Sequence, residues 1–373
     1  MKAAARIGTP ARSVRPYDLG IYLLVGLLAM ALQSGPLSAA PNATASAASS
    51  GGEPAAALET SEAAPRAGTE AQSRLFRFDY RFAISGVEAG KALRVWLPLP
   101  ASSPVQQITP LAARLPAPAT IHEDPIYGNR ILYLEAAMPA QGPMRFDVPY
   151  RIRRREIVPP PQGGSPFDRK LDAHSRQVFL QANAYVPTDG KPLELLRGMA
   201  LGKSPYTQAR QLYDLVDRYV SYKKVGSGWG HGDVRWVCDS RYGNCTDFHS
   251  LFISLARSQG IPARFEIGFS IPGTGLRGAV DGYHCWALFY TPAHGWLPVD
   301  ISEADKRPSL KEYYFGGLTA DRVAFSVGRD IRLVPKGAHG PLNFFIYPHV
   351  EMDGKTLPRE RLMLQFAYSD LPE

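Results

Sequence analysis

One stretch decides the fold: RYGNCTDFHSLFISLARSQGIPARF, residues 241–265. Its large apolar residues recur at helical spacing, at positions 248, 251, 252 and 255, so they form one buried stripe along a helix. Asn244 is a residue type that caps helix N-termini, and Gly260 followed by Pro262 is typical of a helix end. The sequence therefore predicts a helix with Cys245 in its first turn.

The position of Cys245 favours chemistry at its thiol. Unpaired backbone N–H groups and the positive end of the helix dipole lower the pKa of such a thiol toward the reactive thiolate. Gly243 allows a sharp entry into the helix, and Asp247 lies where a carboxylate favours a helix N-terminus. A lone thiol is nevertheless more often a buried structural residue. Chemistry at Cys245 therefore requires a base nearby.

A candidate base lies in a predicted β-hairpin, YHCWALFYTPAHGWLPVDI (283–301), whose two apolar strands flank the loop TPAHG. If Tyr290 pairs with Trp296 across the loop, His284 and Asp300 project from the same face as diagonal neighbours about 7 Å apart or less. A carboxylate at that distance orients an imidazole and, with a thiol, completes a nucleophilic triad. A register slip of one residue would separate the two, so the prediction depends on the loop.

Other side chains near the predicted helix leave alternatives open. His249 lies on the same helix face as Cys245 and could itself pair with the thiolate. Cys238 and Cys285 could form a disulfide in an oxidising compartment, which would leave Cys245 as the free thiol. These cysteines and histidines are also residue types that zinc binds, but CxxC and HExxH spacings are absent from the sequence, and no metal site is predicted.

Three motifs together resemble the core of the transglutaminase-like (papain-like) superfamily: GNCTDFHSLFISLARSQGIPARFEIGF (243–269), YHCWALFY (283–290) and GWLPVD (295–300). The resemblance implies an α+β fold in which a cysteine-bearing helix packs on an antiparallel sheet. It also implies roles for three residues: Cys245 as nucleophile, His284 as general base and acid, and Asp300 as orienting carboxylate. The β-rich N-terminal region and the LNFFIYP tail resemble those of secreted bacterial members.

The reaction that this resemblance implies is acyl transfer from an amide through a thioester, with no cofactor. The oxyanion of the intermediate needs two hydrogen-bond donors, of which the Cys245 backbone N–H is one. The indole N–H of Trp229, in GSGWGHG (226–232), is the candidate for the second, with a packed loop aromatic as the alternative. Asp247 is expected to support the site.

Two β-rich regions flank the predicted catalytic core, 181–305. Apolar residues alternate in RLFRFDYRFAI (74–84), and residues 74–158 are predicted to form an antiparallel β-sandwich domain. PPPQGGSP begins a predicted linker, 159–180. The C-terminal β extension, 306–373, is expected either to complete the catalytic sheet or to pack between the domains.

The N-terminal residues are predicted to direct export. Residues 1–40 read as a signal peptide, because basic residues precede the apolar run LGIYLLVGLLAMAL (19–32), which is shorter than the about 20 residues that span a bilayer. An uncleaved inner-membrane anchor is the alternative. Residues 41–73 have the composition of a disordered tether. The protein is therefore expected in the periplasm or outside the cell, with transient membrane or envelope association left open.

Composition excludes several classes of protein. With 45% hydrophobic and 20% charged residues among 373, the chain is globular rather than disordered, and its three cysteines cannot form a disulfide framework. The formal net charge is +8, with its densest run in RIRRRE (151–156). Alternating arginines on a strand usually mark a solvated face, and the aromatic residues of a single-strand nucleic-acid platform are absent from this run. No nucleic-acid partner is predicted.

The function predicted from the sequence is that of an exported cysteine hydrolase, a protease or amidase, that acts on peptide or isopeptide amides of a peptide or protein substrate. Two alternatives stay open. The first is a protein-glutamine transglutaminase that cross-links amines. The second is a non-catalytic binding module on the same fold, since function does not follow from fold alone.

Overall fold

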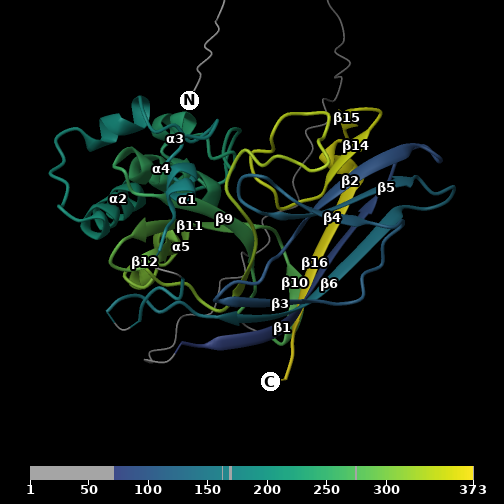
Figure 1. The fold of residues 1–373 in the computed structure, drawn as a ribbon, viewed down its shortest axis with the longest axis horizontal. Helices are drawn as coiled ribbons and strands as arrows, with labels where there is room; N and C mark the ends of the chain where they lie inside the picture. The colour runs from purple at the N-terminus through teal and green to yellow at the C-terminus, as the bar shows by residue number, and fades with distance from the viewer. Residues whose placement is uncertain (1–70, 162, 168–169, 274, 373) are drawn as a thin grey trace, which may run out of the picture. The chain divides into compact units, whose positions relative to one another are not determined.

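The computed structural model describes residues 71–161, 163–167, 170–273 and 275–372. Within these residues two five-stranded sheets and one four-stranded sheet are antiparallel, and a short parallel pair, β7 with β8, completes the strands (Figure 1). The predicted signal peptide and nearly all of the predicted tether, 41–73, lie outside the described residues. The chain is α+β, as the sequence predicts.

The four-stranded sheet, in the order β12-β11-β9-β13, is the predicted catalytic sheet. Tyr290 of β11 pairs with Trp296 of β12, so the predicted hairpin register is confirmed. The fourth strand, β13, comes from the predicted C-terminal extension and pairs with β9. The strands are β9 (Ala263–Ser270), β11 (His284–Thr291), β12 (Gly295–Val299) and β13 (Arg322–Val327).

Helix α4 (Cys245–Ser258) is the helix predicted around Cys245. Asn244 caps it, with its side-chain Oδ1 accepting the Thr246 N–H at 2.8 Å, and Gly260 follows its end with a φ of 73°. One side of α4 packs on β9 and β11, while α2 (Pro205–Tyr219) and α3 (Val234–Ser240) cover the other. The helix is therefore buried all round instead of along the one predicted stripe.

The two five-stranded sheets form the predicted β-sandwich, but they are not built from 74–158 alone. Their orders are β10-β16-β1-β6-β3 and β15-β14-β2-β5-β4, and the strands of the C-terminal segment lie among the N-terminal strands (Figure 1). The extension therefore both completes the catalytic sheet and joins the sandwich. The strands are β1 (Ser73–Ile84), β2 (Ala92–Leu99), β3 (Gln106–Pro110), β4 (Thr120–Glu123), β5 (Arg130–Ala137), β6 (Met144–Arg155), β10 (Arg277–Val280), β14 (His349–Met352), β15 (Lys355–Thr356) and β16 (Leu362–Asp370).

Alternation along the sandwich strands follows the predicted pattern. The even-numbered residues of β1 from Phe76 to Phe82 are buried. On β6, Arg151 and Arg155 are exposed, but Arg154 faces inward, is 2% exposed and hydrogen-bonds Gln106. The arginine run is thus a solvated face with one buried member.

The remaining elements are short and connect the larger ones. Helix α1 lies inside the stretch 159–180 that the sequence assigns to a linker, and all the described residues fall into one compact unit. The domain boundaries themselves stay predictions. No helix of the described residues is long and apolar enough to cross a bilayer. These elements are α1 (Ala173–Val178), η1 (Lys191–Leu196), β7 (Ser221–Tyr222), β8 (Tyr242–Gly243), α5 (Ile301–Lys306), η2 (Pro308–Leu310) and η3 (Arg359–Arg361).

Candidate active site

The cysteine, histidine and aspartate predicted as a triad meet at the N-terminus of α4. Cys245 is the first residue of that helix, His284 begins β11, and Asp300 follows β12 as the N-cap of α5. His284 Nε2 lies 2.7 Å from Asp300 Oδ2, and the Cys245 thiol hydrogen-bonds the same imidazole. Because Nε2 faces the carboxylate, Nδ1 is the ring nitrogen left for the thiol.

Electrostatics at this contact favour a thiolate beside an imidazolium. Burial alone would raise the pKa of the Cys245 thiol, but hydrogen bonds from Cys285 and His284, with the charge on His284, lower that pKa well below its usual value. Burial would lower the pKa of His284, but the charge of Asp300 and the hydrogen bond to it raise that pKa to about 10. A thiol of this kind is ionised at neutral pH.

The buried Asp300 carboxylate accepts hydrogen bonds from several donors. Its Oδ2 also accepts a hydrogen bond at 3.1 Å from Arg322 Nη1, and its Oδ1 accepts from the Ser302 hydroxyl and the Glu303 backbone N–H. Burial opposes the charge, but His284 and Arg322 hold the pKa of the carboxyl well below its ordinary value. The carboxylate is therefore ionised and fixed in orientation.

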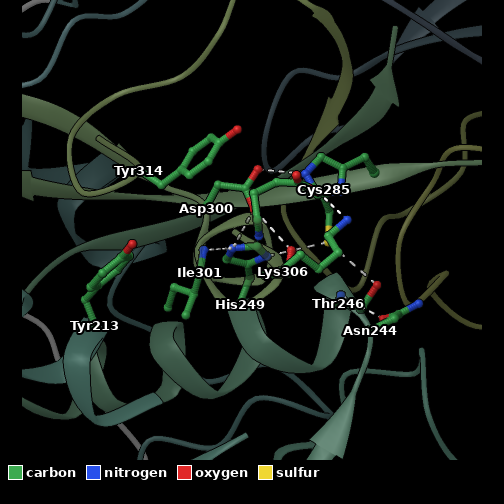
Figure 2. Close-up of polar contacts among 12 residues, drawn as sticks. Tyr213, Asn244, Thr246, His249, Cys285, Asp300, Ile301, Lys306 and Tyr314 are labelled. Atoms are coloured by element: carbon green, nitrogen blue, oxygen red, sulfur yellow. Dashed lines mark hydrogen bonds and ion pairs between the residues drawn. The ribbon is translucent and has the colours of Figure 1, made fainter. Parts of the chain in front are cut away.

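His249 lies beside the site and is the alternative partner for the Cys245 thiolate, but its hydrogen bonds are those of a structural residue. Its Nε2 accepts the Ile301 backbone N–H at 3.0 Å, as the dashed line in Figure 2 marks, so the ring proton lies on Nδ1. Full burial lowers the pKa of His249. A neutral imidazole with its basic nitrogen already occupied is poorly placed to take the thiol proton.

The other two cysteines, Cys238 and Cys285, are free and buried, so they are not joined by the disulfide that the sequence left open. Cys285 lies beside the site: its Sγ is 3.7 Å from Thr246 Oγ1 and 3.9 Å from His249 Nδ1 (Figure 2). Burial raises the pKa of the Cys285 thiol well above its usual value. It is therefore a neutral donor toward Cys245.

Asp247 fastens the glycine-rich loop 226–232 to the start of α4. Its carboxylate accepts the backbone N–H groups of Asn244, Gly230 and Gly232, at 2.8, 2.7 and 2.9 Å. The supporting role expected of Asp247 stays a prediction. Trp229 sits in this loop, and its indole N–H donates to the Gly226 carbonyl at 3.2 Å. Trp229 as an oxyanion donor stays a prediction that requires the indole to leave this acceptor.

Sequence reasoning missed two residues of the site. The Tyr283 hydroxyl contacts Asn244 Nδ2 at 2.9 Å and Thr246 Oγ1 at 3.0 Å, on either side of Cys245, which is itself only 3% exposed. Its position directly before His284 in the sequence could have indicated that Tyr283 lies at the site. Arg322 had no such signal, because it lies on a strand whose position was undecided.

Among the described residues, no three His, Cys, Asp or Glu side chains are grouped so as to hold a metal ion. The groups around Cys245 are instead engaged with one another, as an imidazole, a carboxylate and a guanidinium linked by hydrogen bonds. This arrangement is suited to nucleophilic chemistry at sulfur.

Comparison with known proteins places this site in a family. Residues 194–301 match the model of the transglutaminase-like superfamily, and this core belongs to that superfamily. An uncharacterized protein of Haemophilus influenzae is 27% identical over 333 residues, 79% of this chain and 89% of that protein. A putative cysteine protease from Cytophaga hutchinsonii has a similar fold, with a TM-score of 0.51 and 15% identity, over 82% of this chain and 92% of its own. The periplasmic domain of TgpA from Pseudomonas aeruginosa aligns with a TM-score of 0.35 and 19% identity, over 64% of this chain and 92% of that domain.

Proposed function

We propose that the protein is a cysteine hydrolase that cleaves peptide or isopeptide amides through a thioester, with Cys245, His284 and Asp300 as its triad. One observation carries the proposal: a single buried imidazole hydrogen-bonds both a thiol at a helix N-terminus and an ionised carboxylate. Each partner has a defined use. The carboxylate orients the ring and stabilises its charge, and the ring exchanges protons with the sulfur.

In the first half of the proposed reaction, the Cys245 thiolate attacks the amide carbonyl carbon and a C–S bond forms. The tetrahedral intermediate then collapses, the C–N bond breaks, and the amine leaves with the proton that the His284 imidazolium donates. A thioester on Cys245 and a neutral imidazole remain. The Cys245 backbone N–H, free of an intrahelical acceptor at this position, is one donor for the oxyanion.

In the second half, neutral His284 takes a proton from water, and the hydroxide formed attacks the thioester. The C–S bond breaks, the carboxylic acid leaves, and the proton returns the site to its thiolate–imidazolium state. Asp300 keeps its charge throughout, because its oxygens are held by Arg322, Ser302 and Glu303. A primary amine in place of water would give a new amide instead, the reaction of a transglutaminase.

We also infer that this chemistry takes place outside the cytoplasm. The support is the apolar run at 19–32 preceded by basic residues, which has the length and flanks of an export signal. Fractionation of cells that express the full chain tests this directly. Recovery of the protein in the cytoplasmic fraction, with residues 1–40 retained, would contradict it.

The test of the proposed function is an acyl-enzyme trap. The full chain is incubated with a library of peptide amides, quenched in acid and weighed by intact mass spectrometry. We expect a thioester adduct on Cys245, hydrolysed product, and loss of both in Cys245→Ala. Cys238→Ala is the matched control, since that thiol is also buried but its pKa is raised to about 11 by burial, and it should retain full activity.

Each outcome of the trap has a defined meaning. Product in which an added primary amine is incorporated, in excess of hydrolysis, would replace the hydrolase proposal by a transglutaminase. A protein in which Cys245 forms no adduct with any amide and alkylates no faster than Cys238 would have no activated nucleophile, and the enzymatic proposal would be wrong.

A further inference from the structure

We propose that Arg322 is a positioning residue of the candidate site, whose buried guanidinium holds the Asp300 carboxylate toward His284 and balances its charge. This inference rests on the proposed function and goes beyond the triad. Arg322 is 0% exposed, and its Nη1 lies 3.1 Å from Asp300 Oδ2, the same oxygen that faces His284 Nε2.

The path of Arg322 to Asp300 crosses the catalytic sheet. Arg322 begins β13 at one edge of the sheet, whereas Asp300 follows β12 at the other. The residue between β13 and β11 at the level of His284 is Gly268, which pairs with His284 on one side and with Ala324 on the other. A Cβ at Gly268 would lie 1.8 Å from the Val323 carbonyl oxygen, so a glycine there lets β13 approach closely.

The indole ring of Trp286 packs against the Arg322 guanidinium. The Arg322 Cζ lies 4.9 Å from the centre of the Trp286 ring, a cation–π contact. The indole is fixed in turn, because its Nε1–H donates to Glu266 Oε2 at 2.9 Å. Trp286 and His284 lie on the same face of β11, with ring centres 6.0 Å apart. The arginine is therefore oriented by an aromatic platform next to the proposed base.

Charge balance explains why a cation is needed at this place. With the thiolate and imidazolium formed, the buried groups at the centre are two anions, Cys245 and Asp300, and one cation, His284. Arg322 brings the sum to zero. A further anion, Glu303, is paired with Lys306 and Arg307. The titratable and charged groups that interact with Asp300 are Tyr213 of α2, His249 of α4, His284 and Cys285 of β11, Glu303 of α5 and Arg322 of β13.

Removal of the Arg322 charge should make both reacting groups bind protons more tightly. The thiolate would lose a stabilising cation, and the imidazolium would lose a repelling one, so the pKa of Cys245 and that of His284 both rise. A purely structural arginine would lower stability without moving either pKa. The pH dependence of the thiol therefore separates a positioning role from a structural one.

The experiment measures the second-order rate of Cys245 alkylation by iodoacetamide against pH, in the full chain. For Arg322→Met we expect the acid limb to move upward by about one pH unit, which is about tenfold slower alkylation on that limb. Arg322→Gln, which keeps a hydrogen bond to Asp300 without the charge, should show the same shift, and Arg322→Lys should stay near the wild type. The matched control is Arg264→Met, on the same sheet face but paired with Glu266 instead of Asp300, and its profile should not move.

Three results would overturn the inference: superimposable profiles for the wild type and both neutral variants, equal shifts for Arg322→Lys and Arg322→Met, or a shift in Arg264→Met of the same size. If Arg322→Met fails to fold, the comparison of Arg322→Gln with Arg322→Lys still distinguishes a positioning role of Arg322 from a structural one. An ordinary thiol profile in the wild type would instead contradict the proposed function, so the two failures are distinguishable.

Discussion

Asp247 offers a quantitative test of the forces at the start of α4. Its carboxylate accepts three backbone N–H groups, which favour the charged form, but burial outweighs them and raises its pKa from 3.8 to about 6. The folded state therefore binds a proton more tightly than the unfolded state does, and the contribution of Asp247 to stability falls as the pH rises through this window. At 1.36 kcal/mol per pKa unit, the whole fall is about 3 kcal/mol, of which about 2 kcal/mol lies between about pH 4 and pH 7.

Asp247→Asn removes this titration and leaves the other titrating groups in place. The free energy of unfolding is measured by urea denaturation of the wild type and the variant across the same pH range. The difference between the two free energies of unfolding should shift by about 2 kcal/mol in favour of the variant between about pH 4 and pH 7. Any cost of placing the asparagine amide at this position is the same at every pH, so it does not change the shift. A flat difference, or one that shifts in favour of the wild type, would mean that the three amides and the helix dipole outweigh burial, and the reasoning would be wrong.

Three further predictions concern the groups around Cys245. Gly268→Ala should destabilise the fold by about 3 kcal/mol or more, seen as a lower urea midpoint, because the new methyl group would overlap the backbone of β13; an unchanged midpoint would contradict this. Tyr283→Phe should cost about 1–2 kcal/mol in the same assay, since Asn244 and Thr246 each lose a partner, and no loss would show that the hydroxyl is dispensable. At about pH 7, with limiting iodoacetamide, peptide mapping should find the label on Cys245 and not on Cys238, whose pKa is about 11; equal labelling would refute the difference in ionisation.

Local chemistry made the helix and the hairpin predictable. The apolar spacing of α4, the cap at Asn244 and the stop at Gly260 are interactions between residues close in sequence, and each is found in the structure. The pairing of Tyr290 with Trp296 followed from the length of one loop, and it brought His284 and Asp300 to one face. For such features both partners of each decisive contact lie within one short stretch of the sequence.

Other expectations failed or stayed open because their partners are distant in the chain. The burial of α4 on all sides depends on α2 and α3, which no pattern within the helix indicates. Trp229 was proposed from its loop alone, and the loop gives its indole an acceptor at Gly226. The C-terminal extension contributes strands to the catalytic sheet and to the sandwich. Strand β13 pairs with β9, whereas β14 pairs with β2 and β16 pairs with β1.

The sequence by itself determined the cysteine, histidine and aspartate of the candidate site, since a thiol at a helix start follows from helical spacing, and a histidine beside an aspartate on neighbouring strands follows from strand alternation. Only the tertiary structure decided what surrounds it. Arg322 reaches Asp300 from a strand that lies 22 residues farther along the chain, and that strand approaches β9 so closely at Gly268 that a Cβ there would overlap its backbone. The physical reason is that backbone geometry acts between neighbours, whereas the compensation of a buried charge depends on whichever groups the completed fold brings within reach.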